Sequence, residues 1–219
     1  MKICLIINKE RTHSKKIINF VKKKFNDITI IDVSFSKKKL TKIYNKKFDY
    51  VISYLCPFKI DEKFLKKTKL YNINFHPGPP KYPGFGCYNY AIFNQDKQYS
   101  CVAHLMNNKI DNGIIFHEEK FILKKKISLE DLIKQSNKVL CKLALNVLKK
   151  ISSNKLQIKK IANWSKKKYT KNFLNNKIST LNFKVNQKLF NRFLRATINL
   201  KLGYPLVKIN GHKFRYEKN

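Results

Sequence analysis

Short apolar runs alternate with Lys-rich amphipathic stretches through the first half of the chain, and this alternation constrains the fold more than any other feature. We expect strands at Lys2–Asn8, Ile28–Val33, Asp49–Tyr54 and Leu70–Phe75. Between the first two runs, apolar residues recur at helical spacing: Ile17, Ile18, Phe20, Val21 and Phe25. Strands that alternate with helices form parallel sheets covered by those helices. The pattern therefore predicts an α/β fold with a mostly parallel sheet and helices on both faces.

The first strand-to-helix turn, residues 8–14, contains no glycine. The alternation of strands and helices resembles a Rossmann-like fold, in which a phosphate-binding turn at this place needs glycine so that the backbone can approach the phosphate closely. We therefore do not expect a dinucleotide at this turn.

Two more strands, at Ser100–Met106 and Ile114–Phe121, and a long helix complete the predicted core. Ser128, with Asp131 three residues later, is the expected N-cap of this helix, which ends near Ser152. We place the catalytic core at residues 1–155.

Residues 156–219 form a predicted small C-terminal appendage. It should contain a helix at Phe190–Ala196 and a β-hairpin, because apolar residues alternate on both sides of Asn210-Gly211. The hairpin and the helix offer a surface for a homodimer, which the pattern alone does not decide.

The formal net charge is +35, from 48 basic and 13 acidic residues. Such a charge is typical of proteins that bind RNA, DNA or another polyanion. However, Arg stands only at positions 11, 192, 195 and 215, and the chain is rich in Lys, Asn and Ile, whose codons are rich in A and T. The composition of the genome is therefore an alternative explanation, and the charge does not identify a partner.

The five cysteines are scattered and include no C-x-x-C pair, so the sequence predicts neither a disulfide framework nor a metal site. The N-terminal apolar run is too short for a secretion signal, and no segment approaches the roughly 18 to 20 apolar residues of a membrane span. We expect a soluble, cytoplasmic protein without a metal.

Asn74 and His76 are candidate functional residues at the end of a predicted strand. Because side chains alternate along a strand, both point to one side while Phe75 points into the sheet. A rigid Pro/Gly-rich loop, residues 76–84, follows, and a short helix is expected at Tyr88–Phe93. Asp111 lies in an Asp-Asn-Gly turn after the next strand, in which His104 has the pattern of a structural histidine.

Three motifs in this order, Asn74-Phe75-His76-Pro77, Lys81-Tyr82-Pro83-Gly84 and Asp111-Asn112-Gly113, resemble those of the formyltransferases that use 10-formyltetrahydrofolate. The strand and proline-ended loop at residues 49–57 are also similar to the family's pterin-binding wall. The resemblance covers residues 49–121 most closely. One departure is Gly78-Pro79-Pro80, where the family usually has two leucines.

The resemblance implies direct attack of an acceptor amine on the formyl carbon through a tetrahedral intermediate. Asn74 would donate an N–H to the growing oxyanion, as His76 also can. Asp111 would orient the His76 ring and accept or relay the proton of the amine. No metal and no covalent enzyme intermediate is required.

The resemblance also implies the two binding regions. The folate co-substrate, 10-formyltetrahydrofolate, is expected between the loop of Cys56, Pro57 and Phe58 and the loop of Asn107, Lys109 and Ile110. The acceptor is expected against Pro77, Gly78, Tyr88, Asn89 and Trp164. Trp164 or Tyr169 could stack on a nucleotide base, and a core contact that anchors the tail is the alternative for Trp164.

Three acceptor classes occur in this family. Glycinamide ribonucleotide formyltransferases bind a phosphate on a Gly-rich first turn, which this chain lacks, and methionyl-tRNA formyltransferases carry a full C-terminal barrel, for which too few residues remain. The sequence is most similar to short sugar N-formyltransferases that act on nucleotide-linked amino sugars, with dTDP as the expected nucleotide. A basic nucleic-acid-binding protein on the same scaffold is the non-enzyme alternative.

Overall fold

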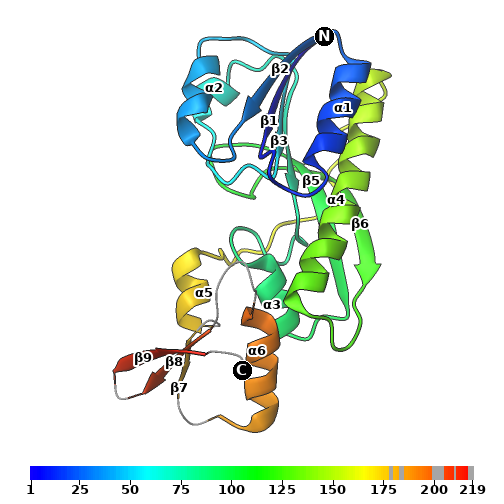
Figure 1. Ribbon diagram of the computed structural model, residues 1–219. Coiled ribbons are helices and arrows are strands. Elements are labelled where there is room, and N and C mark those ends of the chain that lie inside the picture. Colours follow the sequence, from blue (N-terminus) through cyan, green and yellow to red (C-terminus); the bar gives the residue numbers. More distant parts are fainter. Residues whose placement is uncertain (178–179, 183–184, 199–204, 210, 217–219) are drawn as a thin grey trace.

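A six-stranded sheet forms the centre of the larger part of the molecule (Figure 1). The computed structural model describes residues 1–177, 180–182, 185–198, 205–209 and 211–216. The strands are β1 (Lys2–Ile7), β2 (Asp27–Asp32), β3 (Tyr50–Tyr54), β4 (Tyr71–His76), β5 (Gln98–Leu105) and β6 (Ile115–Ile122), in the spatial order β2-β1-β3-β4-β5-β6. The pairs among β1 to β4 are parallel, and β5 and β6 pair antiparallel. The predicted mostly parallel sheet is confirmed.

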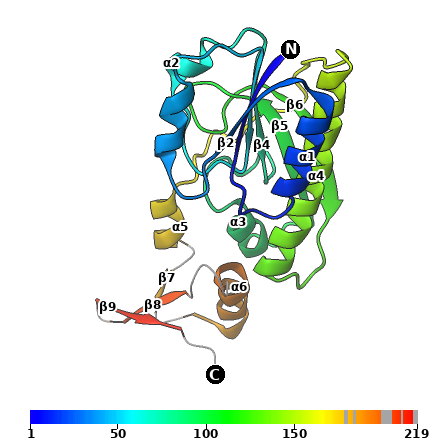
Figure 2. The ribbon, with the colours of Figure 1, turned by 45° about the horizontal axis from the view of Figure 1, so that its top comes forward.

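Helices cover both faces of this sheet, as predicted. Helices α1 (Ser14–Lys24) and α4 (Leu129–Ser152) lie side by side on one face (Figure 2). The opposite face packs against a 3₁₀ helix, η1 (Lys37–Ile43), and the short helix α2 (Glu62–Leu65). No helix was predicted at α2, because a four-residue helix is too short to show a periodic pattern; the side chain of Asp61 caps it.

A side-chain cap explains where the long helix α4 begins. The side chain of Ser128 accepts a hydrogen bond from the N–H of Asp131, so α4 begins at the predicted cap and ends at Ser152. Helix α3 (Cys87–Phe93) follows Gly86, whose φ of 86° suits glycine. In the part of the chain that the structure describes, no helix is long and apolar enough to cross a membrane.

The described residues of the C-terminal part form two helices and a three-stranded sheet. They are α5 (Lys171–Lys177), β7 (Thr180–Asn182), α6 (Gln187–Thr197), β8 (Leu206–Ile209) and β9 (His212–Arg215). Strands β8 and β9 pair antiparallel, so the predicted hairpin is present; Asn210 of its turn lies outside the described residues. Helix α6 packs against α3, where the Asn89 side chain donates a hydrogen bond to the Ala196 carbonyl at 2.7 Å.

The chain between α4 and α5 returns across the core, and we call residues 155–170 the return segment. The Ile161 N–H bonds the Ile115 carbonyl at 3.0 Å, and the Ser165 N–H bonds the Pro80 carbonyl at 2.9 Å. Ile161 and Ser165 both follow the expected domain boundary at residue 155. That boundary stays a prediction. Through these contacts, the first part of the expected appendage packs against the larger part of the molecule.

Candidate functional site

Asn74, His76 and His104 share one face of the sheet. Phe75, between the first two, is buried in the core on the opposite face. In the antiparallel pairing of β4 with β5, Asn74 stands opposite His104 and His76 opposite Val102. Because directly opposed residues of two strands point to the same side, the register brings both imidazoles and the Asn74 amide together.

The Asp111 carboxylate joins the two histidines. Its Oδ2 lies 3.2 Å from His76 Nδ1, and its Oδ1 lies 3.3 Å from His104 Nε2. The Gly84 N–H also donates to Oδ2, at 2.8 Å. All three side chains are buried, with exposed fractions of 4% for His76, 2% for His104 and 9% for Asp111. The structure therefore brings the predicted Asn74, His76 and Asp111 into one connected group.

Asp111 stays ionised in this group. Burial alone raises the pKa of a carboxyl, but the nearby His76 charge and the hydrogen bonds from both imidazoles hold the pKa of Asp111 well below its usual range. A buried carboxylate with these partners can orient both rings and stabilise either of them as a cation.

His104 contacts two members of the predicted trio, which the sequence pattern did not reveal. Its Nδ1 lies 2.8 Å from the Leu105 carbonyl, which can only accept, so Nδ1 carries a proton. In the neutral ring, Nε2 then accepts a hydrogen bond from Asn74 Nδ2 at 3.0 Å; in the protonated ring, Nε2 carries a proton and donates to Asp111 Oδ1 at 3.3 Å instead. The Asn74 amide has two N–H groups, so one is held by His104 and one remains available for a ligand.

The turn that carries Asp111 has a positive φ at Asp111 and a close backbone approach at Gly113. Asp111 itself has a φ of 44°, in the left-handed region. Gly113 passes so close to β5 that a Cβ there would lie 1.9 Å from the Leu105 carbonyl oxygen. The Asp-x-Gly pattern is thus explained: glycine lets the turn fold down onto the sheet, and this places the carboxylate over the histidines.

His76 Nε2 is buried and has no hydrogen-bond partner among the described residues. The Pro/Gly-rich loop covers it, since a Cβ at Gly78 would lie 2.8 Å from Nε2 and 2.7 Å from Cys87 Cβ. Because Nδ1 of the same ring faces Asp111, Nε2 is the ring nitrogen that has no partner in the described part of the chain.

The Pro/Gly-rich loop is anchored at both ends. At its start, the Pro77 carbonyl accepts hydrogen bonds from the Tyr99 hydroxyl and from Ser136 Oγ, both at 3.0 Å. At its end, Gly84 lies against the return segment, where a Cβ would come within 2.3 Å of the Tyr169 carbonyl oxygen. Such anchoring fixes the backbone next to His76.

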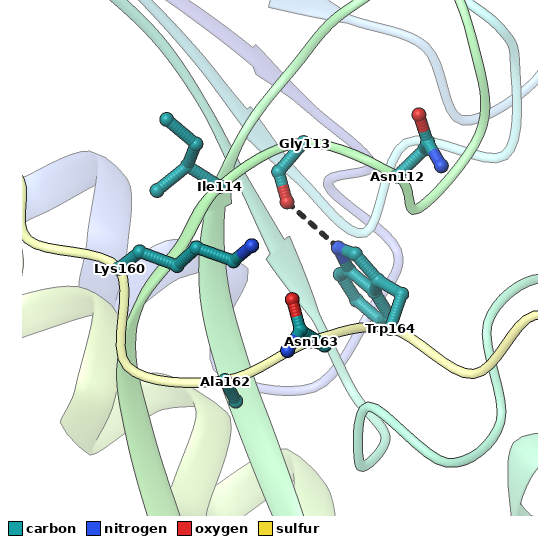
Figure 3. A pocket seen from close by; sticks show the side chains of 7 residues that line it. All are labelled: Asn112, Gly113, Ile114, Lys160, Ala162, Asn163 and Trp164. Atoms are coloured by element: carbon teal, nitrogen blue, oxygen red, sulfur yellow. Dashed lines mark hydrogen bonds between the residues drawn. The ribbon is translucent and has the colours of Figure 1, made fainter.

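Trp164 lies beside the histidines. Its indole N–H donates to the Gly113 carbonyl at 2.8 Å, and its ring meets those of His76 and His104 edge-on, with centroids 5.5 and 5.0 Å apart. Trp164 also lines a pocket of about 220 Å³ on the outer side (Figure 3). The lining residues are Asn112, Gly113, Ile114, Lys160, Ala162, Asn163 and Trp164. Stacking of Trp164 on a nucleotide base and its core-contact alternative both stay predictions.

The expected folate-binding residues lie in two loops on the same side of the sheet. Cys56 and Phe58 pack against the same apolar cluster as Met106, which precedes the second loop. Pro57, Asn107 and Lys109 are exposed, and Ile110 is 61% exposed next to Asp111. The described residues contain no group of His, Cys, Asp and Glu side chains arranged for a metal.

The expected acceptor-binding residues are not all together. Pro77 and Gly78 adjoin His76, and Tyr88 stacks on Tyr99 with centroids 5.9 Å apart. The Asn89 amide instead serves the contact with α6, and Tyr169 packs among the rings of Tyr82, Tyr90 and Phe173.

Comparisons with known proteins identify the family and the fold. A family model described as formyl transferase matches residues 35–148, more than half of the 219-residue chain. No curated protein matches the sequence. The fold is similar to that of a sugar N-formyltransferase from Shewanella, with a TM-score of 0.79 and 18% identity over 100% of this chain and 97% of that one.

Two further solved structures share the fold. A 4-N formyltransferase from Francisella tularensis has a TM-score of 0.77 and 18% identity, and the match covers 100% of this chain and 99% of that one. An N-formyltransferase from Helicobacter canadensis, in complex with folinic acid and dTDP-3-aminofucose, has a TM-score of 0.74 and 18% identity over 97% and 86%.

Proposed function

Because this chain belongs to the formyl transferase family, we propose that it moves the formyl group of 10-formyltetrahydrofolate to the amine of a nucleotide-linked amino sugar, with dTDP as the expected nucleotide. The observation that carries this proposal is the connected group in which Asp111 contacts His76 and His104, and His104 contacts Asn74. The choice of a sugar is supported by the similarity in fold, over the full chain, to sugar N-formyltransferases.

In the proposed reaction, the lone pair of the acceptor amine attacks the formyl carbon, and the π electrons of the carbonyl move to its oxygen. The free N–H of Asn74 donates to this oxyanion. In other enzymes, removal of one such donor costs roughly 3 kcal/mol of transition-state stabilisation. Holding both substrates next to the trio lowers the barrier further, because it removes the entropy cost of their encounter.

The amine must lose one proton before the intermediate collapses, and the nitrogen of tetrahydrofolate must gain one as it leaves. His76 Nε2, which has no partner among the described residues, is suited to take the first proton and to return it to the leaving nitrogen. Asp111, with its lowered pKa, stabilises the imidazolium between these two transfers. The C–N bond to the folate then breaks and its electron pair stays on the folate nitrogen.

We also propose residues that bind the folate and the acceptor. Folate is assigned to Cys56, Pro57 and Phe58 on one loop and to Asn107, Lys109 and Ile110 on the other, which is supported by the exposed Ile110 side chain directly beside Asp111. The acceptor is assigned to Pro77, Gly78 and Tyr88, with Asn89 next to them. A stacking contact of the acceptor with Trp164 is the alternative to a positioning role of this residue. The folinic acid and dTDP-3-aminofucose of the Helicobacter canadensis protein represent the two ligand classes expected here.

The decisive experiment is formyl transfer from 10-formyltetrahydrofolate to a panel of dTDP- and GDP-linked amino sugars, glycinamide ribonucleotide and methionyl-tRNA. We expect turnover with one sugar nucleotide, and its loss in the Asp111→Asn and His76→Ala variants. Turnover with tRNA or with glycinamide ribonucleotide would contradict the proposed acceptor while leaving the reaction intact.

The same samples test the non-enzyme alternative, which the charge of +35 keeps open. A nucleic-acid-binding protein would show no turnover with any acceptor, no folate binding and a steep salt dependence of its affinity for generic RNA. Folate binding together with turnover would exclude that alternative.

A further inference from the structure

Trp164, the single tryptophan of the chain, stands between the buried histidines and the outer pocket. One side of the indole contacts His76 and His104, with interplanar angles of 78° and 88° that place ring edges against ring faces. Figure 3 shows the indole at the wall of the pocket, beside the backbone of residues 112–114. The indole therefore lies between the pocket and the two buried imidazoles, where it can keep solvent away from them.

The indole N–H also holds the turn that carries Asp111. It donates to the carbonyl of Gly113, two residues after Asp111. On its inner side the turn runs close to β5, since a Cβ at Gly113 would lie 1.9 Å from the Leu105 carbonyl oxygen. The hydrogen bond from Trp164 restrains the turn on the outer side. Together the two contacts fix the position of the turn and hence of its carboxylate.

We propose that Trp164 is a positioning residue of the formyl transfer site: it clamps the Asp111 turn through its N–H and keeps water away from both imidazoles through its ring. This proposal rests on the proposed function. It assigns Trp164 no contact with the reacting atoms; the residue acts through Asp111, His76 and His104. A second consequence is that the appendage is coupled to catalysis, because Trp164 lies in its first part, the return segment.

Because Trp164 lines a pocket, small molecules can test its two roles, the hydrogen bond to Gly113 and the exclusion of water, one at a time. In a Trp164→Ala variant, the pocket of about 220 Å³ would extend inward to the imidazoles and would accept a small aromatic molecule from solution. Indole supplies both the ring and the N–H, whereas benzofuran supplies the ring alone. Rescue by indole but not by benzofuran isolates the hydrogen bond to Gly113; equal rescue by both assigns the effect to the exclusion of water.

We would measure kcat, KM and the pH profile of kcat for Trp164→Phe and Trp164→Ala. A misplaced catalytic group costs up to about a hundredfold in rate, so we expect kcat to fall at least about tenfold in Trp164→Ala while KM for both substrates changes by less than about threefold. The pH profile should change as well, because water weakens the interaction of Asp111 with the two imidazoles.

The matched control is Phe173→Ala. Phe173 packs on Tyr90 and Tyr169 with centroids 5.9 Å away in both cases, so it anchors the same part of the chain without touching the histidines. This variant should lower the melting temperature with the pH profile unchanged. If Trp164→Phe and Trp164→Ala behave in the same way as Phe173→Ala, Trp164 is only a packing residue and the proposal is wrong. A raised KM for the acceptor with unchanged kcat would also overturn it, in favour of a direct substrate contact.

A spectroscopic measurement tests the proposal even if no acceptor is turned over. The fluorescence of the single tryptophan should change as the neighbouring imidazoles are protonated, and the change should be altered in His76→Asn and in His104→Asn. A fluorescence signal that does not respond to pH, or that is unaffected by both substitutions, would contradict the contact of Trp164 with the histidines. Inactivity with the whole panel, by contrast, would count against the proposed function alone.

Discussion

Nδ1 of His76 lies 3.2 Å from Oδ2 of Asp111, and the same carboxylate oxygen receives the N–H of Gly84 at 2.8 Å. One oxygen atom thus ties together the end of β4, the turn before β6 and the end of the Pro/Gly-rich loop. The partners of the Asp111 carboxylate come from different parts of the chain, so its negative charge also helps to hold these parts together. Substitutions at Asp111 therefore test both the chemistry and the assembly of the site.

Asp111→Asn should abolish most of the activity while leaving the fold intact, because the carboxamide has nearly the same shape but no charge to stabilise an imidazolium. We expect formyl transfer in a single turnover to fall by about 10²- to 10⁴-fold, the usual contribution of a proton-transfer group. Folate affinity, measured by calorimetry with folinic acid, should change little. A loss below about tenfold would remove Asp111 from the proposed mechanism.

The same substitution should change how stability depends on pH. The pKa of Asp111 in the folded protein lies below the ordinary value of about 3.9, owing to His76 and His104 despite its burial. Its stabilising effect is complete above that ordinary value and is lost as the pH falls toward the folded-state pKa. In urea denaturation between about pH 6 and 3, the difference in unfolding free energy between wild type and Asp111→Asn should shrink with acid. A constant difference would show that the Asp111 pKa is not lowered by folding.

The sheet was predictable because burial leaves a strong pattern. Strands β1 and β3 are buried almost throughout, so their sequences are continuous apolar runs, and the predicted bounds lie within one residue of those observed. Helix α5 and strand β7 were not predicted. They have seven and three residues, too few for a periodic pattern to stand out from their Lys- and Asn-rich surroundings.

The site was predictable only in part, since motifs identify residues but not their partners. Asn74, His76 and Asp111 follow from the ordered motifs. The part of His104 depends on the register between β4 and β5 and on a turn that folds back over the sheet, neither of which leaves a pattern in the sequence. The bond from Trp164 to Gly113 spans 51 residues and depends on the path of the return segment.

His104→Ala should slow the reaction although His104 has no place in the motifs. The substitution removes the acceptor for one Asn74 N–H and one partner of Asp111, so both groups lose orientation. We expect kcat to fall by about ten- to a hundredfold, the effect of a small misplacement. The control is His117→Ala on β6, because His117 contacts Glu119 at 3.5 Å and no member of the trio. Equal activity of the two variants would mean that His104 only fills space.

Gly113 and Gly211 are a matched pair for substitution by alanine, because each opposes a side chain for a different physical reason. At Gly113 a Cβ would lie 1.9 Å from the Leu105 carbonyl oxygen, and backbone cannot give way as a flexible side chain can. At Gly211 no atom lies within 4 Å of such a Cβ, and only its φ of +87° opposes substitution.

Gly113→Ala should therefore lose at least about 1–3 kcal/mol of stability by overpacking, and Gly211→Ala about 1 kcal/mol from backbone strain. The two differ more in activity than in stability. Moving Gly113 shifts Asp111 and breaks the bond to Trp164, so kcat should fall by about tenfold or more. Gly211 lies in the distant hairpin, and kcat of its variant should match wild type. Chemical denaturation and steady-state kinetics on both variants decide the matter: if kcat is retained in Gly113→Ala, the turn tolerates displacement and the carboxylate need not be held where the structure has it.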